Sequence, residues 1–219
     1  MSKRTFSKDE VIERVQNVFP KSEIMFIYYC GSIAFGLDDE NSDVDVTAVL
    51  DDFKGNVHLS LGDLDIFAFG QDVYMKKQEQ DSSVALYYRA YMDEILSTKD
   101  NLIYINSRYQ NEYERYKNID FNKILGPFLN SFVMQNEVRI KDLVPYKSHY
   151  HILRVRGILD HVDRVGKYEL IVEEPWYSRM IEYKKNWDNQ IGIKYMPVLE
   201  RELRYIAEYR DKVMKDELG

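Results

Sequence analysis

Two aspartates separated by one residue, Asp43 and Asp45, lie in an alternating, β-branched segment that predicts a strand over residues 43–50. Successive side chains of a strand point to opposite faces, so both carboxylates should share one face, roughly 6.6 Å apart along the backbone. Two carboxylates this close repel each other, and a divalent cation between them resolves the conflict. Mg²⁺ prefers such hard oxygen ligands, with coordination positions left open for phosphate.

A third aspartate, Asp65, opens the next predicted strand, residues 64–69. On a strand beside the first pair it would complete a set of three carboxylates. Such a set can hold two metal ions about 3.5–4 Å apart and clamp an in-line phosphoryl or nucleotidyl displacement. Asp63 is the alternative, two residues earlier on the same face, and we favour Asp65 because a continuous apolar strand follows it.

A glycine-containing turn precedes the paired aspartates. Gly31 and Ser32 follow directly on a predicted buried strand, residues 23–30. Glycine lets the backbone approach a phosphate closely, the N–H groups of a following helical turn favour an anion, and the Ser32 hydroxyl adds a donor. With Gly36 keeping the turn tight, a phosphate-binding turn leads into a two-carboxylate strand within 15 residues.

The segment resembles the signature of the DNA polymerase-β-like nucleotidyltransferase superfamily, which is Gly-Ser, a further Gly, and then Ser-Asp-x-Asp. All of these positions are filled here, and the resemblance covers residues 24–69, about a fifth of the chain. The resemblance implies a magnesium-dependent, ATP- or other NTP-binding transferase that moves NMP to an acceptor hydroxyl and releases pyrophosphate. It implies two Mg²⁺ ions, with Mn²⁺ as an alternative, and it assigns the metal-binding and catalytic roles to Asp43, Asp45 and Asp65.

By the same resemblance the nucleotide phosphates bind at Gly31, Ser32 and Ser42. Related enzymes also bring a Lys from a helix after the catalytic sheet to the triphosphate. Here the stretch 139–167 holds seven Lys/Arg against three Asp. This suggests nucleotide binding by Lys147, His151 and Arg154.

Those three residues belong to a basic stripe, continued by His161 and Arg164, on a helix predicted over residues 148–165. Two interpretations stay open for the stripe. It is either a solvated helix face or a basic wall for the triphosphate or for an acceptor phosphate.

The acceptor is less constrained than the reaction. Residues 147–154 and 166–170 resemble a subgroup of predicted nucleotidyltransferases associated with RNA-ligase and RNA-repair functions, which implies an RNA or tRNA 3′ end. Two other acceptors remain open: a small, aminoglycoside-like molecule, whose positive charge would suit an acidic protein, and a protein side chain, as in antitoxins that modify a toxin. The alternative that is not an enzyme is an inactive nucleotide-binding module, and the intact set of three carboxylates argues against it.

The composition narrows the class of protein. The 219 residues carry a net charge of −7. This excludes the class of proteins that coat nucleic acid, because those proteins are usually basic over their whole surface. The single cysteine, Cys30, excludes an intramolecular disulfide and a cysteine-based zinc site. We expect no membrane span and no signal sequence, and hence a cytoplasmic protein, whose oligomeric state the sequence does not fix.

The spacing of apolar residues changes along the chain, from strands with helices in the first part to helices almost throughout the second. A capping box at Ser7 and Glu10 predicts a helix over residues 8–19, and residues 51–62 read as a turn or hairpin. Further helices are predicted over residues 83–96, 121–138, 175–187 and 197–215, with Pro175 and Pro197 in first turns.

This order predicts an α+β fold: an N-terminal polymerase-β-like nucleotidyltransferase sheet with helices, followed by a C-terminal helical domain. We place the catalytic domain at residues 1–112 and the helical domain at 113–219, so that the boundary falls within the polar stretch 106–117. We expect the nucleotide to bind in a cleft between the two domains.

Overall fold

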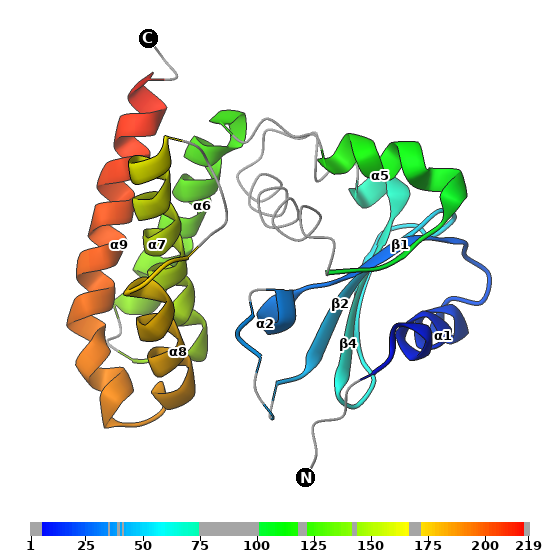
Figure 1. Ribbon diagram of the computed structural model, residues 1–219, viewed down its shortest axis with the longest axis horizontal. Coiled ribbons are helices and arrows are strands. Elements are labelled where there is room, and N and C mark those ends of the chain that lie inside the picture. Colours follow the sequence, from blue (N-terminus) through cyan, green and yellow to red (C-terminus); the bar gives the residue numbers. More distant parts are fainter. Residues whose placement is uncertain are drawn as a thin grey trace. The chain divides into compact units, whose positions relative to one another are not determined.

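The computed structural model describes residues 6–34, 36–38, 40, 42–74, 101–117, 122–141, 144–166 and 172–216 (Figure 1). The described residues form two compact units, the first within residues 6–117 and the second within residues 122–216. The helix predicted over residues 83–96 lies outside the described residues.

The first unit is built on a five-stranded mixed sheet in the order β3-β4-β2-β1-β5. Its central strands, β2 and β4, run parallel, and every other pair of neighbours is antiparallel. The strands are β1 Ile24–Tyr29, β2 Val44–Leu50, β3 Asn56–Ser60, β4 Leu64–Gly70 and β5 Leu102–Ile105. The helical segments include α1 Lys8–Val18, α2 Gly31–Ala34, the 3₁₀ turn Ser107–Tyr109 and α5 Gln110–Lys117.

The two faces of this sheet have separate cores. On one face Val11 and Val15 of α1 pack with even-numbered residues of β2, such as Val46. On the other face Val49 and Phe69 pack with a cluster of tyrosines that includes Tyr28, Tyr74 and Tyr109. Odd-numbered positions of β2 and β4 therefore share the second face, and this parity carries Asp45 and Asp65 to the same side.

Helix α1 begins at the predicted capping box. The Ser7 hydroxyl accepts from the backbone N–H of Glu10 at 3.2 Å, and the Glu10 carboxylate accepts from the backbone N–H of Ser7 at 2.7 Å. Both bonds satisfy donors that the first helical turn would otherwise leave unpaired.

Replacing Ser7 by Ala should lower the free energy of unfolding by about 1 kcal/mol, because one of these cap bonds is lost. Urea denaturation measures the change. Ser7→Asp, which keeps an acceptor at the same place, should recover most of the loss. A Ser7→Ala protein as stable as the wild type would show that α1 does not depend on this cap.

The second unit is entirely helical in its described part. It contains α6 Asn122–Ile140, the 3₁₀ turn Lys147–His149, α7 Tyr150–Val165, α8 Trp176–Asn186 and α9 Gln190–Asp216. Helix α6 packs against α9, and α7 packs against both α8 and α9 (Figure 1). The predicted α+β class, a mixed sheet followed by a helical region, is confirmed.

Some expected features differ from the observed elements. Residues 107–117, within the stretch where we placed the domain boundary, form the 3₁₀ turn and α5 of the first unit. The division into domains at 112/113 stays a prediction. The placement of Pro197 in a first turn was wrong: α9 starts at Gln190, where the Asn189 side chain accepts from the N–H of Ile191 at 2.8 Å, and Pro197 lies inside the helix. Strand β5 was not predicted, because four residues are too few to show a period.

Within the described residues, no helix combines the length and the apolar character that crossing a membrane requires.

Candidate functional site

The parallel pairing of β2 and β4 brings two of the predicted carboxylates together. Asp45 and Asp65 are directly paired across the two strands, and both side chains are half-buried. Neighbouring strands lie about 4.8 Å apart, so the two carboxylates leave the same face of the sheet side by side. Asp43 precedes β2, is exposed, and lies two residues before Asp45.

The same register bears on the choice between Asp65 and Asp63. Asp63 lies before β4, is exposed, and takes part in the pairing of the strands only through its carbonyl, which accepts from the N–H of Val44 at 2.8 Å. Asp65 is the residue that pairs with Asp45, and its role as the third carboxylate stays a prediction.

Gly31 presses its backbone against Asp45. Its φ is +59°, and a Cβ built on it would lie 2.0 Å from the Oδ2 atom of Asp45. The preceding amide, that of Cys30, donates to the Asp45 carbonyl at 2.8 Å and holds the start of the turn against β2. Only glycine combines this conformation with so close an approach.

The turn after Gly31 is closed by backbone hydrogen bonds. The N–H of Gly36 donates to the carbonyl of Ile33 at 3.1 Å, and that of Leu37 donates to the carbonyl of Ser32 at 2.8 Å. Leu37 is buried, whereas Ser32 and, just before β2, Ser42 are half-buried. These bonds hold the described backbone between Ser32 and Leu37, which follows Gly31 and its contact with Asp45.

His58 joins this face from the edge strand β3, and sequence reasoning missed it. Its ring stacks on that of Phe67, with centroids 4.3 Å apart and planes inclined by 5°. Its Nε2 atom lies 3.7 Å from Oδ2 of Asp65. The alternation of residues 56–60 was the available signal, but the contact depends on the β3–β4 register, which pairs His58 with Phe67.

Cys30 lies beside the carboxylates but is not suited to act as a nucleophile. Its thiol is buried, and burial, with smaller contributions from the charges of Asp45 and Asp65, raises its pKa, against a lowering effect of a hydrogen bond with Thr47. The thiol therefore stays neutral, as expected of a small buried hydrophobe.

The types of the residues present fit a hard divalent cation. Asp45 and Asp65 carry paired carboxylates on one face of the sheet, and Gly31, which has no Cβ, lies against the Oδ2 atom of Asp45. Across the described ranges no three potential metal-binding side chains are gathered into one group, so the part of Asp43 as a third ligand stays a prediction.

The basic stripe of the second unit is solvated only in part. Arg154 and His161 are buried, at 3% and 5% exposure, because α7 is covered on most of its circumference. Lys147 and Arg164 are exposed, and Arg164 pairs with Glu173. The solvated-face interpretation is wrong for Arg154 and His161, and triphosphate binding by Lys147, His151 and Arg154 stays a prediction.

Two histidines at the start of α7 are held in the neutral form. Burial, together with the nearby charge of Arg139, lowers the pKa of His149 to about 4. Burial and the charges of Arg154 and Arg139 lower the pKa of His151 well below its ordinary value. His149 has no exposed surface, and no described group pairs with its Nε2 atom.

The unfolded chain therefore binds more protons than the folded chain once the pH falls below about 6.5, and stability should fall from there down to about pH 4. From pH 7 to pH 5 the loss attributable to His149 should be roughly 2 kcal/mol of unfolding free energy. Urea denaturation at both values measures it, and His149→Gln should flatten the slope. An unchanged slope in His149→Gln would contradict the assignment.

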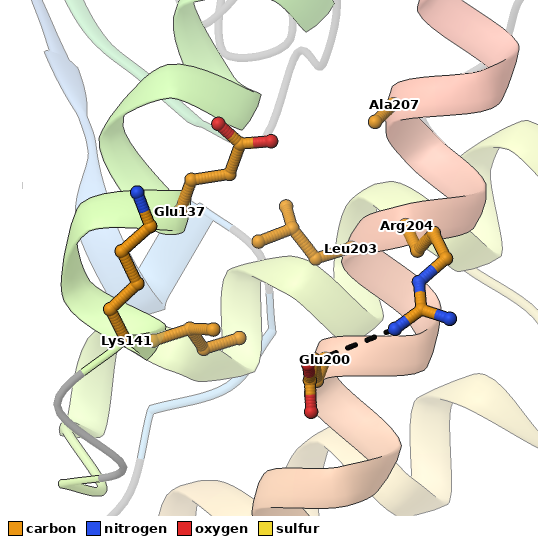
Figure 2. Close-up of a pocket in the computed structure, with 7 residues that line it drawn as sticks. Glu137, Lys141, Glu200, Leu203, Arg204 and Ala207 are labelled. Atoms are coloured by element: carbon orange, nitrogen blue, oxygen red, sulfur yellow. Dashed lines mark ion pairs between the residues drawn. The ribbon is translucent and has the colours of Figure 1, made fainter.

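A groove of about 320 Å³ lies between α6 and α9 (Figure 2). Glu137 and Lys141 line it from α6, and Glu200, Leu203 and Arg204 line it from α9. Glu200 and Arg204 form an ion pair at 3.7 Å, so the groove carries mixed charge. It contains none of the predicted site residues, as far as the described residues show, and mixed charge does not favour a triphosphate.

The chain matches no protein-family model and no curated protein. Among solved structures it is similar to a nucleotidyltransferase-like protein from Exiguobacterium sibiricum 255-15, with 12% identity and a TM-score of 0.33, over 94% of this chain and 78% of that one. At that TM-score the likeness carries no argument about the function of this chain.

Proposed function

We propose that this chain is a metal-dependent nucleotidyltransferase that moves NMP from an NTP to an acceptor hydroxyl and releases pyrophosphate. One observation supports the proposal above all others. The parallel register pairs Asp45 with Asp65 on one face, while Gly31 brings a turn of the predicted phosphate-binding segment against Asp45.

The roles of the residues follow from this arrangement. Asp43, Asp45 and Asp65 would hold divalent cations, and the half-buried position of the last two restricts their side chains. Bound divalent cations would activate the acceptor hydroxyl and neutralise charge that develops on the triphosphate. Gly31 permits close approach of the backbone to a phosphate, and the hydroxyls of Ser32 and Ser42 would donate to its oxygens.

The acceptor that we propose first is an RNA 3′ end, with a role in RNA repair, on the strength of the sequence resemblance in the second half of the chain. The burial of Arg154 and His161 removes part of the exposed basic surface that supported it. A cationic small molecule remains the alternative favoured by the net charge of −7, and a protein side chain is a third class. RNA binding should weaken steeply with salt, which separates RNA from the other two classes.

The direct test is label transfer from each α-labelled NTP in Mg²⁺, with total RNA as acceptor and Asp43→Ala as the matched inactive control. Label on RNA that the variant does not produce would establish RNA nucleotidyl transfer and the preferred base. Pyrophosphate released only when cell extract is added would indicate a metabolite or protein acceptor. Neither label nor pyrophosphate under any of these conditions would contradict the proposed function.

A further inference from the structure

We propose that His58 is a nitrogen ligand, beside Asp65, for a metal ion at this site, and that the site therefore accepts a first-row transition-metal ion such as Mn²⁺. The inference rests on the proposed function, because it adds a ligand to the metal site which that function requires. It concerns the ion next to Asp65, on the edge-strand side of the carboxylate pair.

The distance between the two side chains fits a shared ion. Metal–ligand bonds of about 2.1 Å at angles of 90–120° place two ligand atoms about 3.0–3.6 Å apart. The Nε2 atom of His58 and the Oδ2 atom of Asp65 are 3.7 Å apart, so a shift of a few tenths of an ångström brings both within bonding distance.

The imidazole is also oriented for this role. Stacking on Phe67, with the planes inclined by only 5°, fixes the plane of the ring and keeps Nε2 on the side of Asp65. The His58 side chain is 50% exposed and that of Asp65 is 22% exposed, so an ion can reach both from solvent. The pairing of β3 with β4 fixes the two strands that carry the ligands.

The chemistry of the donor set then decides which ion is bound. Mg²⁺ is held by oxygen ligands, whereas imidazole is a common ligand of first-row transition metals. Asp45 and Asp65 alone would suit Mg²⁺, and a nitrogen from His58 would raise the affinity for transition ions selectively. The preference for Mn²⁺ over Mg²⁺ should thus depend on His58.

Pulsed EPR of Mn²⁺ bound to the full, untagged chain tests this directly, since an imidazole ligand gives ¹⁴N modulation of the echo. Inorganic triphosphate replaces NTP in the sample, because the nitrogens of a base would give a similar signal. His58→Phe keeps a ring stacked on Phe67 and removes the nitrogen. Asn56→Ala, on the same strand and face, is the matched control.

We expect ¹⁴N modulation in the wild type and in Asn56→Ala, and its loss in His58→Phe. The Mn²⁺ affinity of His58→Phe should fall about tenfold or more, since even the loss of a residue that hydrogen-bonds to a metal ligand changes metal affinity by that factor. Bound Mn²⁺ without ¹⁴N modulation in the wild type, or with modulation that persists in His58→Phe, would overturn the inference. Label transfer measured on the same samples keeps the two proposals apart. If transfer persists without ¹⁴N modulation, only the inference about His58 fails, whereas absence of both Mn²⁺ binding and transfer removes the proposed function as well.

Discussion

Replacing Asp45 by Asn is expected to reduce NMP transfer by about 10³-fold or more. The neutral amide is a poor ligand for a hard divalent cation, and the loss of one carboxylate from a metal site removes several kcal/mol of transition-state stabilisation. Asp45 is half-buried, with the backbone of Gly31 against its carboxylate and Asp65 paired with it on the neighbouring strand. Label transfer from α-labelled NTP measures the effect.

The same substitution should not destabilise the fold. Asp45 and Asp65 are paired across neighbouring strands, and like charges placed so close repel each other. In the presence of EDTA, Asp45→Asn should therefore have a Tm equal to or slightly above that of the wild type. Adding Mg²⁺ with NTP should raise the Tm of the wild type but not that of the variant, because only a protein that binds the ligand gains stability from it.

Asp63→Asn is the matched control, because Asp63 lies two residues before Asp65 and is exposed. It should retain activity and the Tm shift on ligand addition. An Asp45→Asn protein that transfers NMP at the wild-type rate would remove this residue from the metal site. A variant that lost several degrees of Tm in EDTA would instead point to a structural role for the carboxylate.

The parts of the fold that sequence predicts well depend on local chemistry. The start of α1 follows from the exchange of hydrogen bonds between Ser7 and Glu10, which are three residues apart. Strands β1, β2 and β4 lie within one residue of their predicted ends, because β-branched and aromatic residues at short period determine them. The spacing of Asp43 and Asp45 likewise needs only the alternation of one strand.

The parts that sequence predicts poorly depend on pairing between distant segments. The register that sets Asp45 against Asp65 joins strands that are separated by the whole of β3, and no local period encodes it. His58 reaches the site through a second register, that of β3 with β4. The sequence left open whether Arg154 lies on a solvated helix face, because it lies opposite an apolar stripe. Helices α8 and α9 both pack against α7, and Arg154 is buried.

Gly31→Ala tests whether the backbone at the turn must lie against Asp45. A Cβ at this position would lie 2.0 Å from the Oδ2 atom of Asp45 and 2.8 Å from its Cγ atom, so the carboxylate has to rotate or the turn has to move away. Either response displaces a predicted metal ligand from its place beside Asp65. A displacement of about 1 Å can cost on the order of 10²-fold in rate, so we expect at least that loss of NMP transfer.

The substitution also strains the backbone, because alanine at a φ of +59° costs about 1–2 kcal/mol. Gly62→Ala separates the two effects: its φ is +70°, and a Cβ there would meet no atom within 4 Å. Gly62→Ala should lose only the free energy of the backbone strain in urea, and Gly31→Ala should lose at least as much, because it adds the contact with Asp45. Only Gly31→Ala should lose activity and the rise in Tm with Mg²⁺ and NTP. Equal activity in the two variants would mean that the contact between Gly31 and Asp45 has no part in catalysis, and the phosphate-binding role of the turn would then lose its structural basis.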